Sequence, residues 1–289
     1  MRLLISSPLA PAFVTSLVLL AAVMHAVWNA LIKGSRDQVG TQACLMLVGV
    51  LMAAAAIPWV PLPARESWPL LAVSVVVHTV YRVVLVQAYR EGDLSRVYPL
   101  ARGFAPLLVA LAATHLADEW LNRWETIGVF LVSGGIASLA FEKRSPRQPS
   151  RRPVVLALLT GLFVSSYSLI DGIGARRAGS AIGYAAWLFV FEGLPFVVGT
   201  VIVRRRDLRA IVRSCWKSGL LGGVISTLGY TIVIWAMSVG GLAQTIALRE
   251  TSVIIAALIG IGLMKEGSGV RRIAAAAIVV VGNLLLQIF

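Results

Sequence analysis

The stretch AYREGDLSRVYPLARGFAPLLVA, from Ala88 to Ala110, predicts a short polar hairpin that leads into a membrane helix broken near its middle. A second stretch with the same order of polar and apolar blocks, AMSVGGLAQTIALRETSVIIAAL, lies 148 residues further on, from Ala236 to Leu258. At the same offset, Gly134 coincides with Gly282. Because the blocks match across the whole chain, we predict an internal duplication.

The composition indicates an integral membrane protein in a lipid bilayer. Of the 289 residues, 58% are hydrophobic and 13% are charged, and the mean hydropathy is +0.85. A soluble domain is typically about 25% charged. The net charge of +13 does not predict a nucleic-acid partner, because the basic residues lie in short loops between apolar blocks. Cys44 and Cys215 show no metal-binding spacing, and we predict neither a metal nor another cofactor.

Ten apolar segments predict transmembrane helices, because about 20 residues at 1.5 Å per residue cross about 30 Å of hydrocarbon. They cover residues 11–32, 41–60, 68–89, 94–116, 122–141, 153–175, 181–203, 215–238, 242–263 and 270–288. The polar linker 143–152 separates a first repeat, 1–142, from a second, 153–289. Five is an odd number of spans, so the two copies must lie in opposite orientations. The predicted fold class is an all-α integral membrane protein with ten transmembrane helices in two inverted five-helix repeats.

Lysine and arginine residues predict the orientation of the chain in the membrane. Eighteen of the 26 lie in loops on one side of the predicted helices, five lie on the other side, and three lie inside helices. The positive-inside rule places the larger group in the cytoplasm, so both termini are predicted outside it.

Charged residues inside the predicted helices mark a candidate site. Arg82, Arg102 and Arg249 lie within helices, as do Glu192 and Glu250. A charge at the bilayer centre costs roughly 2.5–3.5 kcal/mol, so such residues are expected to face a bundle interior or a water-filled cavity. Either they pair with one another and hold the bundle together, or they line a polar cavity. Arg102 and Glu250 occupy equivalent positions of the repeat, and we predict that they line one cavity and pair.

Two prolines, Pro99 and Pro106, remove backbone hydrogen bonds from the helix 94–116. We predict a break there whose freed carbonyls face a ligand, with a simple kink as the alternative. The equivalent helix 242–263 has no proline at the matching positions. The break is therefore predicted in the first copy only.

Further polar and aromatic residues on these helices complete the predicted site. The candidate substrate-binding residues are His25, Trp28, Asn29, His78, Arg82, Tyr98, Arg102, Tyr230, Arg249 and Glu250. Glu192 and Glu250 are candidates for coupling transport to protons. Asp171 lies near the end of its helix, where we predict an interfacial ion pair with Arg176 or Arg177.

Three segments resemble the EamA-type branch of the drug/metabolite transporter superfamily: HAVWNALIK, AYREGDLSRVYPLARG and ALRETSVIIAALIG, which begin at His25, Ala88 and Ala247. The likeness covers the chain as two EamA-like repeats. It implies a ten-helix secondary transporter of a bacterial-type inner membrane, with a central cavity lined by the first, third, fourth, sixth, eighth and ninth helices. Glu192 does not lie on these helices. Many relatives have both termini in the cytoplasm, opposite to the orientation predicted from the basic residues.

The predicted function is secondary active transport of a small polar metabolite, an amino acid or a related zwitterionic or anionic solute, by alternating access. The carrier is expected to work as an exporter, or by proton coupling or exchange, as a monomer or homodimer. We predict no enzymatic activity, because the histidines lack metal-site spacing. Nucleotide-driven transport is not predicted, because no phosphate-binding loop occurs. The alternatives are a broad-specificity drug exporter, an intramembrane enzyme and a structural membrane protein.

Overall fold

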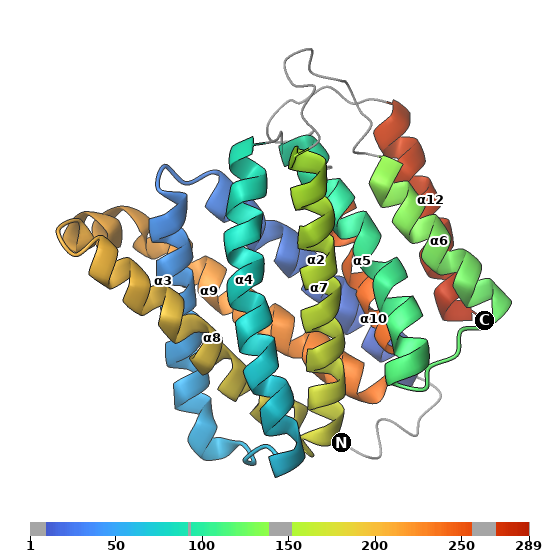
Figure 1. Ribbon diagram of the computed structural model, residues 1–289, viewed down its shortest axis with the longest axis horizontal. Helices are drawn as coiled ribbons and strands as arrows, with labels where there is room; N and C mark the ends of the chain where they lie inside the picture. Colours follow the sequence, from blue (N-terminus) through green and yellow to red (C-terminus); the bar gives the residue numbers. More distant parts are fainter. Residues whose placement is uncertain (1–9, 92–93, 139–151, 256–269, 289) are drawn as a thin grey trace. The chain divides into compact units, whose positions relative to one another are not determined.

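A computed structural model describes residues 10–91, 94–138, 152–255 and 270–288 (Figure 1). Within these ranges the regular structure is helical, which agrees with the predicted all-α class. The α-helices are α2 (Ala10–Lys33), α3 (Gln38–Ala56), α4 (Trp68–Glu91), α5 (Leu94–Leu116), α6 (Arg123–Ser138), α7 (Arg152–Arg177), α8 (Ala181–Val203), α9 (Leu208–Val239), α10 (Leu242–Arg249) and α12 (Val270–Ile288). Two short 3₁₀ helices, η1 (Ile57–Trp59) and η2 (Arg65–Ser67), lie between α3 and α4.

Six helices in the described ranges are long and apolar enough to cross a membrane. These candidate spans are Pro11–Ile32, Gln38–Trp59, Arg65–Leu85, Arg152–Arg177, Ala181–Val203 and Leu208–Val239. The count of ten spans and their inverted arrangement stay predictions. Residues 139–141 and 256–263 of the predicted helices, and the linker up to residue 151, lie outside the described residues.

The predicted start of one helix and the predicted break in another differ from the structure. α9 begins at Leu208 instead of residue 215. The prediction began the helix at its apolar part, whereas the polar, basic residues before it are also helical. The break predicted in the helix 94–116 is wrong: α5 is continuous, since each proline removes one hydrogen bond without ending the helix. The interruption falls in the other copy, where α10 ends at Arg249.

The ends of several helices are set by local side-chain bonds and by one glycine. α3 begins after Asp37, whose carboxylate accepts hydrogen bonds from the Gly40 amide at 2.9 Å and from Arg204 Nη1 at 2.7 and 2.8 Å. Partial burial raises the pKa of Asp37, but these bonds outweigh it and leave the pKa below its ordinary value. After α7, Gly179 adopts a φ of +70°, which glycine tolerates without strain.

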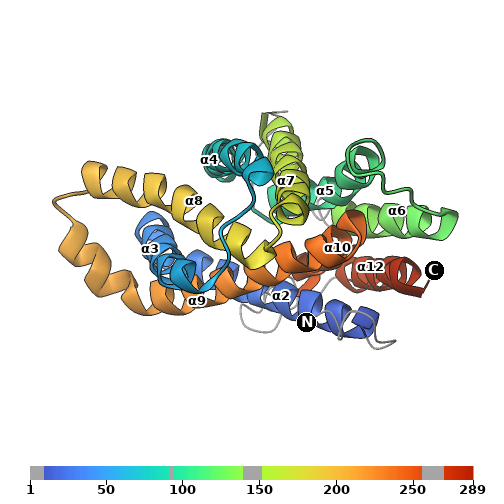
Figure 2. The same ribbon diagram turned by 90° about the horizontal axis from the view of Figure 1, so that it is seen from below.

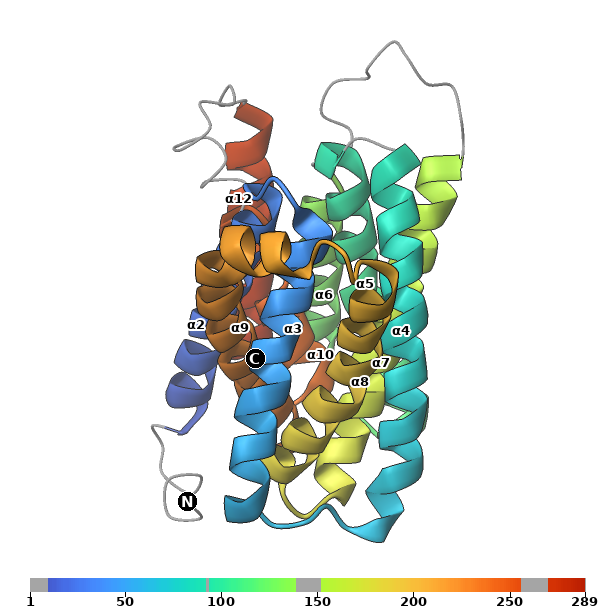
Figure 3. The same ribbon diagram turned by 90° about the vertical axis from the view of Figure 1, so that its left-hand side faces the viewer.

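The first of two compact units comprises Met1–Val75 and Asp171–Val239. Within it α3 lies between α8 and α9 (Figure 2), and α2 lies beside α9 (Figure 3). Glycines allow the close approach: a Cβ at Gly223 of α9 would lie 2.6 Å from the Val48 Cβ of α3. Small residues commonly line such interfaces in membranes, where van der Waals packing between helices replaces the hydrophobic effect.

The second unit comprises Val76–Ile170 and Gly240–Phe289, and it contains α5, α6, α10 and α12. α6 and α12 lie side by side (Figure 1). Gly128 of α6 and Gly282 of α12 face each other, since a Cβ on either would lie within 2.8 Å of the other's carbonyl oxygen. The two backbones therefore meet at a pair of glycines.

Replacing Gly128 with alanine is expected to destabilise the protein, because the new Cβ would lie 2.7 Å from the Gly282 carbonyl oxygen. Overpacking of this kind costs about 1–3 kcal/mol. Gly134→Ala, on the same helix, is the matched control, since its Cβ would meet no atom of the described chain within 4 Å. Thermal unfolding in detergent should give a lower Tm for Gly128→Ala than for Gly134→Ala. Equal Tm values would contradict the close packing of α6 and α12.

Candidate functional site

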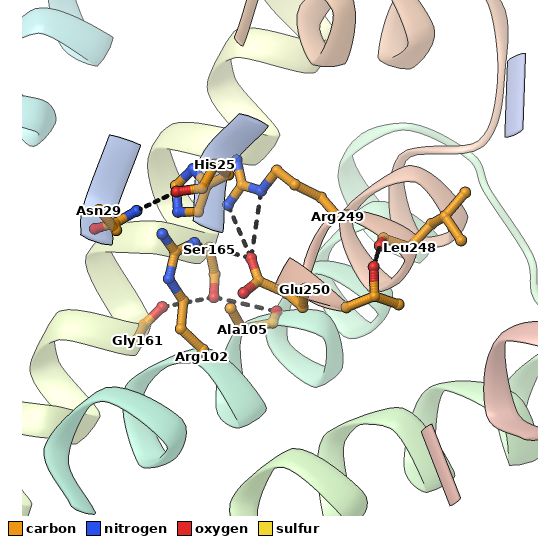
Figure 4. Close-up of polar contacts among 10 residues, drawn as sticks. His25, Asn29, Arg102, Ala105, Gly161, Ser165, Leu248, Arg249 and Glu250 are labelled. Atoms are coloured by element: carbon orange, nitrogen blue, oxygen red, sulfur yellow. Dashed lines mark hydrogen bonds and ion pairs between the residues drawn. The ribbon is translucent and has the colours of Figure 1, made fainter. Parts of the chain in front are cut away.

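An ion pair inside the second unit joins the two residues that the repeat relates. Arg102 of α5 is 4% exposed and Glu250, which follows α10, is fully buried. Arg102 Nη1 donates to Glu250 Oε1 at 2.9 Å (Figure 4). The predicted pairing of Arg102 with Glu250 is confirmed.

A second guanidinium binds the same carboxylate oxygen. Arg249 Nη2 lies 3.0 Å from Glu250 Oε1, and its Nε lies 3.3 Å from the same atom. The other oxygen, Oε2, is buried and has no hydrogen-bond partner among the described residues. The three side chains, called the ion cluster below, therefore carry two positive charges and one negative charge, with one acceptor unused.

The interruption after α10 positions the carboxylate of the ion cluster. Glu250 caps α10, and both the amide and the hydroxyl of Thr251 donate to the Leu248 carbonyl (Figure 4). A threonine hydroxyl that bonds a nearby carbonyl competes with regular helical hydrogen bonding. Helical geometry resumes only at residue 252. The turn that ends the helix thus presents Arg249 and Glu250 side by side.

The other end of α10 is held by two acidic side chains, one in the α5–α6 connection and one in the first turn of α6. Glu119 Oε2 accepts a hydrogen bond from the Leu242 amide at 2.8 Å, and Glu125 Oε1 accepts one from Gln244 Nε2 at 2.7 Å. A carboxylate at a helix N-terminus also interacts favourably with the helix dipole. α10 is therefore fixed at both ends by ionic groups.

α7 fixes the segment of α5 that carries Arg102. Ser165 Oγ donates to the carbonyls of Ala105, at 3.2 Å, and Gly161, at 2.7 Å (Figure 4). A Cβ at Gly161 would lie 2.7 Å from the Ala101 carbonyl oxygen, so only glycine permits this approach. The backbone on both sides of Arg102 is thereby held against α7.

Three further candidate residues lie in the second unit. His78 is buried and stacks on Tyr167 with ring centroids 4.0 Å apart, and Tyr81 meets the same ring edge-on at 5.4 Å. Arg82 is partly buried one turn further along α4. The side chain of Tyr98 lies outside the described residues.

The remaining candidates lie in the first unit. His25 and Trp28 form an edge-to-face pair at 4.9 Å, and Asn29 Nδ2 donates to the His25 carbonyl at 2.7 Å (Figure 4). Glu192 of α8 is 6% exposed. The Tyr230 hydroxyl donates to Asp171 Oδ2 at 2.6 Å.

The interfacial role predicted for Asp171 is wrong. Asp171 is fully buried and accepts hydrogen bonds from the hydroxyls of Ser74, Tyr184 and Tyr230. Arg176 Nε donates to the Met237 carbonyl at 2.9 Å. The prediction assumed that a residue near the end of a helix is exposed at the membrane interface, but tertiary packing buries this end of α7. The sequence did contain a signal for a buried site, since Asp171 is an acidic residue within an apolar helix.

Comparison with known proteins connects this site to a family. Residues 151–288 match the EamA-like transporter family. The match covers the C-terminal half of the chain. The predicted resemblance to EamA-type drug/metabolite transporters is therefore confirmed, and it indicates a membrane transporter with a small-molecule substrate.

Two individual proteins are also similar to this chain. RbsU of Latilactobacillus sakei subsp. sakei (strain 23K), named as a ribose uptake protein, is 23% identical over 245 residues, which cover 79% of each chain. A crystal structure of another protein matches with a TM-score of 0.75 at 16% identity and covers 96% of each chain. At that identity the likeness shows the fold alone.

Exchange of the paired charges tests the ion cluster. Arg102→Glu and Glu250→Arg, made singly, should each destabilise the protein by about 3–5 kcal/mol, because each breaks the buried Arg102–Glu250 pair and places a like charge beside the remaining partner. The double exchange keeps two positive charges and one negative charge and should recover part of the lost Tm in detergent. A double variant no more stable than the worse single variant would contradict direct pairing.

Proposed function

We propose that this EamA-type protein is a secondary active transporter for a small zwitterionic or anionic metabolite, such as an amino acid. The observation that supports this most directly is the ion cluster. Both guanidinium groups contact one oxygen of Glu250, and the second oxygen is left without a partner among the described residues. Two buried guanidinium groups beside a carboxylate oxygen that has no partner among the described residues suit a ligand that brings a carboxylate and a hydrogen-bond donor.

Each end of such a solute has a partner in the ion cluster. The solute's carboxylate would bind Arg102 and Arg249, because guanidinium groups form strong charge-assisted bonds with carboxylates. Its ammonium group would donate to Glu250 Oε2. A bulky cationic drug fits less well, because the cluster already carries more positive than negative charge.

Alternating access is the mechanism proposed for this carrier. Two inverted five-helix repeats, 1–142 and 153–289, would open a midplane site to one side of an inner membrane and then to the other. The interrupted α10 supports this proposal, because transporters use broken helices to present backbone and side-chain groups to ligands. Glu192 and Glu250 remain candidates for proton coupling, with both termini proposed to lie outside the cytoplasm.

A sugar is the second candidate substrate. RbsU is named for ribose uptake, and its similarity extends over 79% of this chain. Sugar hydroxyls would also donate to Glu250 Oε2 and accept from the two arginines. A sugar would, however, bring no negative charge to the two guanidinium groups, so we favour the zwitterion.

Flux into liposomes tests the proposed function. Purified protein should accumulate or exchange a radiolabelled amino acid mixture, and Arg102→Ala should reduce that flux to the level of empty liposomes. Arg209→Ala is the matched control, because Arg209 is an exposed residue in the basic first turns of α9. Uptake of labelled ribose alone would select the sugar. Chemical turnover of solute without flux would contradict transport and favour an intramembrane enzyme.

A further inference from the structure

A second buried acidic group lies in the first unit, on α7. Asp171 is fully buried, as is Ser74 of α4. Asp171 Oδ1 accepts hydrogen bonds from the hydroxyl of Ser74 and from that of Tyr184 of α8, the latter at 3.2 Å. Asp171 Oδ2 accepts a hydrogen bond from the Tyr230 hydroxyl of α9 at 2.6 Å. One carboxyl group is thus bonded to three helices besides its own.

Close packing holds the two tyrosines of this cluster in place. A Cβ at Gly174, one turn after Asp171, would lie 2.6 Å from the ring and hydroxyl atoms of Tyr184. Glycine at that position therefore lets the Tyr184 ring lie directly against α7. The Phe189 ring packs edge-on against Tyr230 with centroids 6.2 Å apart. These contacts fix the hydroxyls around the carboxyl group of Asp171.

The chemistry of the three partners accommodates both protonation states of the acid. A carboxylate only accepts hydrogen bonds, and the three hydroxyls donate to it. A carboxylic acid carries one O–H donor, and a hydroxyl oxygen can accept from it after rotating its own hydrogen towards another acceptor. The same cage can therefore hold Asp171 with or without a proton, and the heavy atoms need not move far.

We propose that Asp171 is a proton-binding site whose protonation is coupled to transport. One proton adds to the carboxylate on one side of the membrane and leaves it on the other. The change redirects hydrogen bonds that join α4, α7, α8 and α9. Ser74, Asp171, Tyr184 and Tyr230 all belong to the first unit, so the change acts on the packing within that unit.

Other titratable groups lie near Asp171 in the described structure. Tyr184 of α8 and Tyr230 of α9 face it directly, and α4 contributes the Ser74 hydroxyl. On α7 itself, the Arg176 side chain is directed to the Met237 carbonyl of α9. Protonation of Asp171 therefore changes its hydrogen bonds to Ser74, Tyr184 and Tyr230.

The coupling role depends on the proposed function, whereas the binding of a proton does not. pH-titrated infrared difference spectroscopy of the purified protein in lipid measures proton binding without any solute. The wild type should show the C=O stretch of a protonated carboxylic acid that Asp171→Asn lacks. Tyr230→Phe should retain the band at a shifted frequency, because one hydrogen bond to the carboxyl group is lost. Asp118→Asn should leave the band unchanged, since Asp118 is exposed.

Flux measurements then test coupling in the same liposomes. With the radiolabelled amino acid mixture, Asp171→Asn should lose accumulation driven by a pH gradient and keep exchange of labelled for unlabelled solute. An infrared band that survives in Asp171→Asn, or its absence from the wild type, would overturn the proton site. Normal pH-driven accumulation by Asp171→Asn would overturn the coupling role. If the wild type moves neither amino acids nor ribose, the proposed function fails, while the spectrum still decides whether Asp171 binds a proton.

Discussion

The carboxylate of Glu250 is the group on which the rest of the second unit depends. Transfer of an ion from water into a protein interior costs several kcal/mol even after the structure relaxes. Arg102 and Arg249 together bring two such charges into an apolar bundle, and Glu250 Oε1 lies within 3.0 Å of both guanidinium groups. Without this carboxylate, neither arginine would keep the negative partner that the structure shows.

Contacts between the helices around the ion cluster hold its three charged side chains next to one another. Ser165 and Gly161 hold α5 against α7, and Glu119 holds the start of α10. Lipid tails are as apolar as leucine side chains, so the hydrophobic effect does little to associate helices within a bilayer. Close packing at glycines and bonds between polar groups therefore set the positions of the helices in each unit.

The helical architecture was largely predictable, because hydropathy and turn-forming residues depend only on local sequence. The pairing of Arg102 with Glu250 was predictable as well, because the 148-residue offset relates distant positions. The Asp171 cluster was not, since its partners Ser74 and Tyr230 lie 97 and 59 residues away and no repeat relates them. The break after α10 was also missed, because it contains no proline and instead coincides with the bonds of Thr251 to the Leu248 carbonyl.

Ligand-induced stabilisation of the purified protein tests most directly whether the ion cluster is a binding site. An amino acid, the same acid without its amino group, and the same amine without its carboxylate would each be added during thermal unfolding in detergent. The amino acid should raise the Tm most, the acid less, and the amine not at all. In Glu250→Gln, the advantage of the amino acid over the acid should disappear. Equal stabilisation by the amine, or stabilisation by ribose alone, would contradict a zwitterion site formed by two arginines and one glutamate.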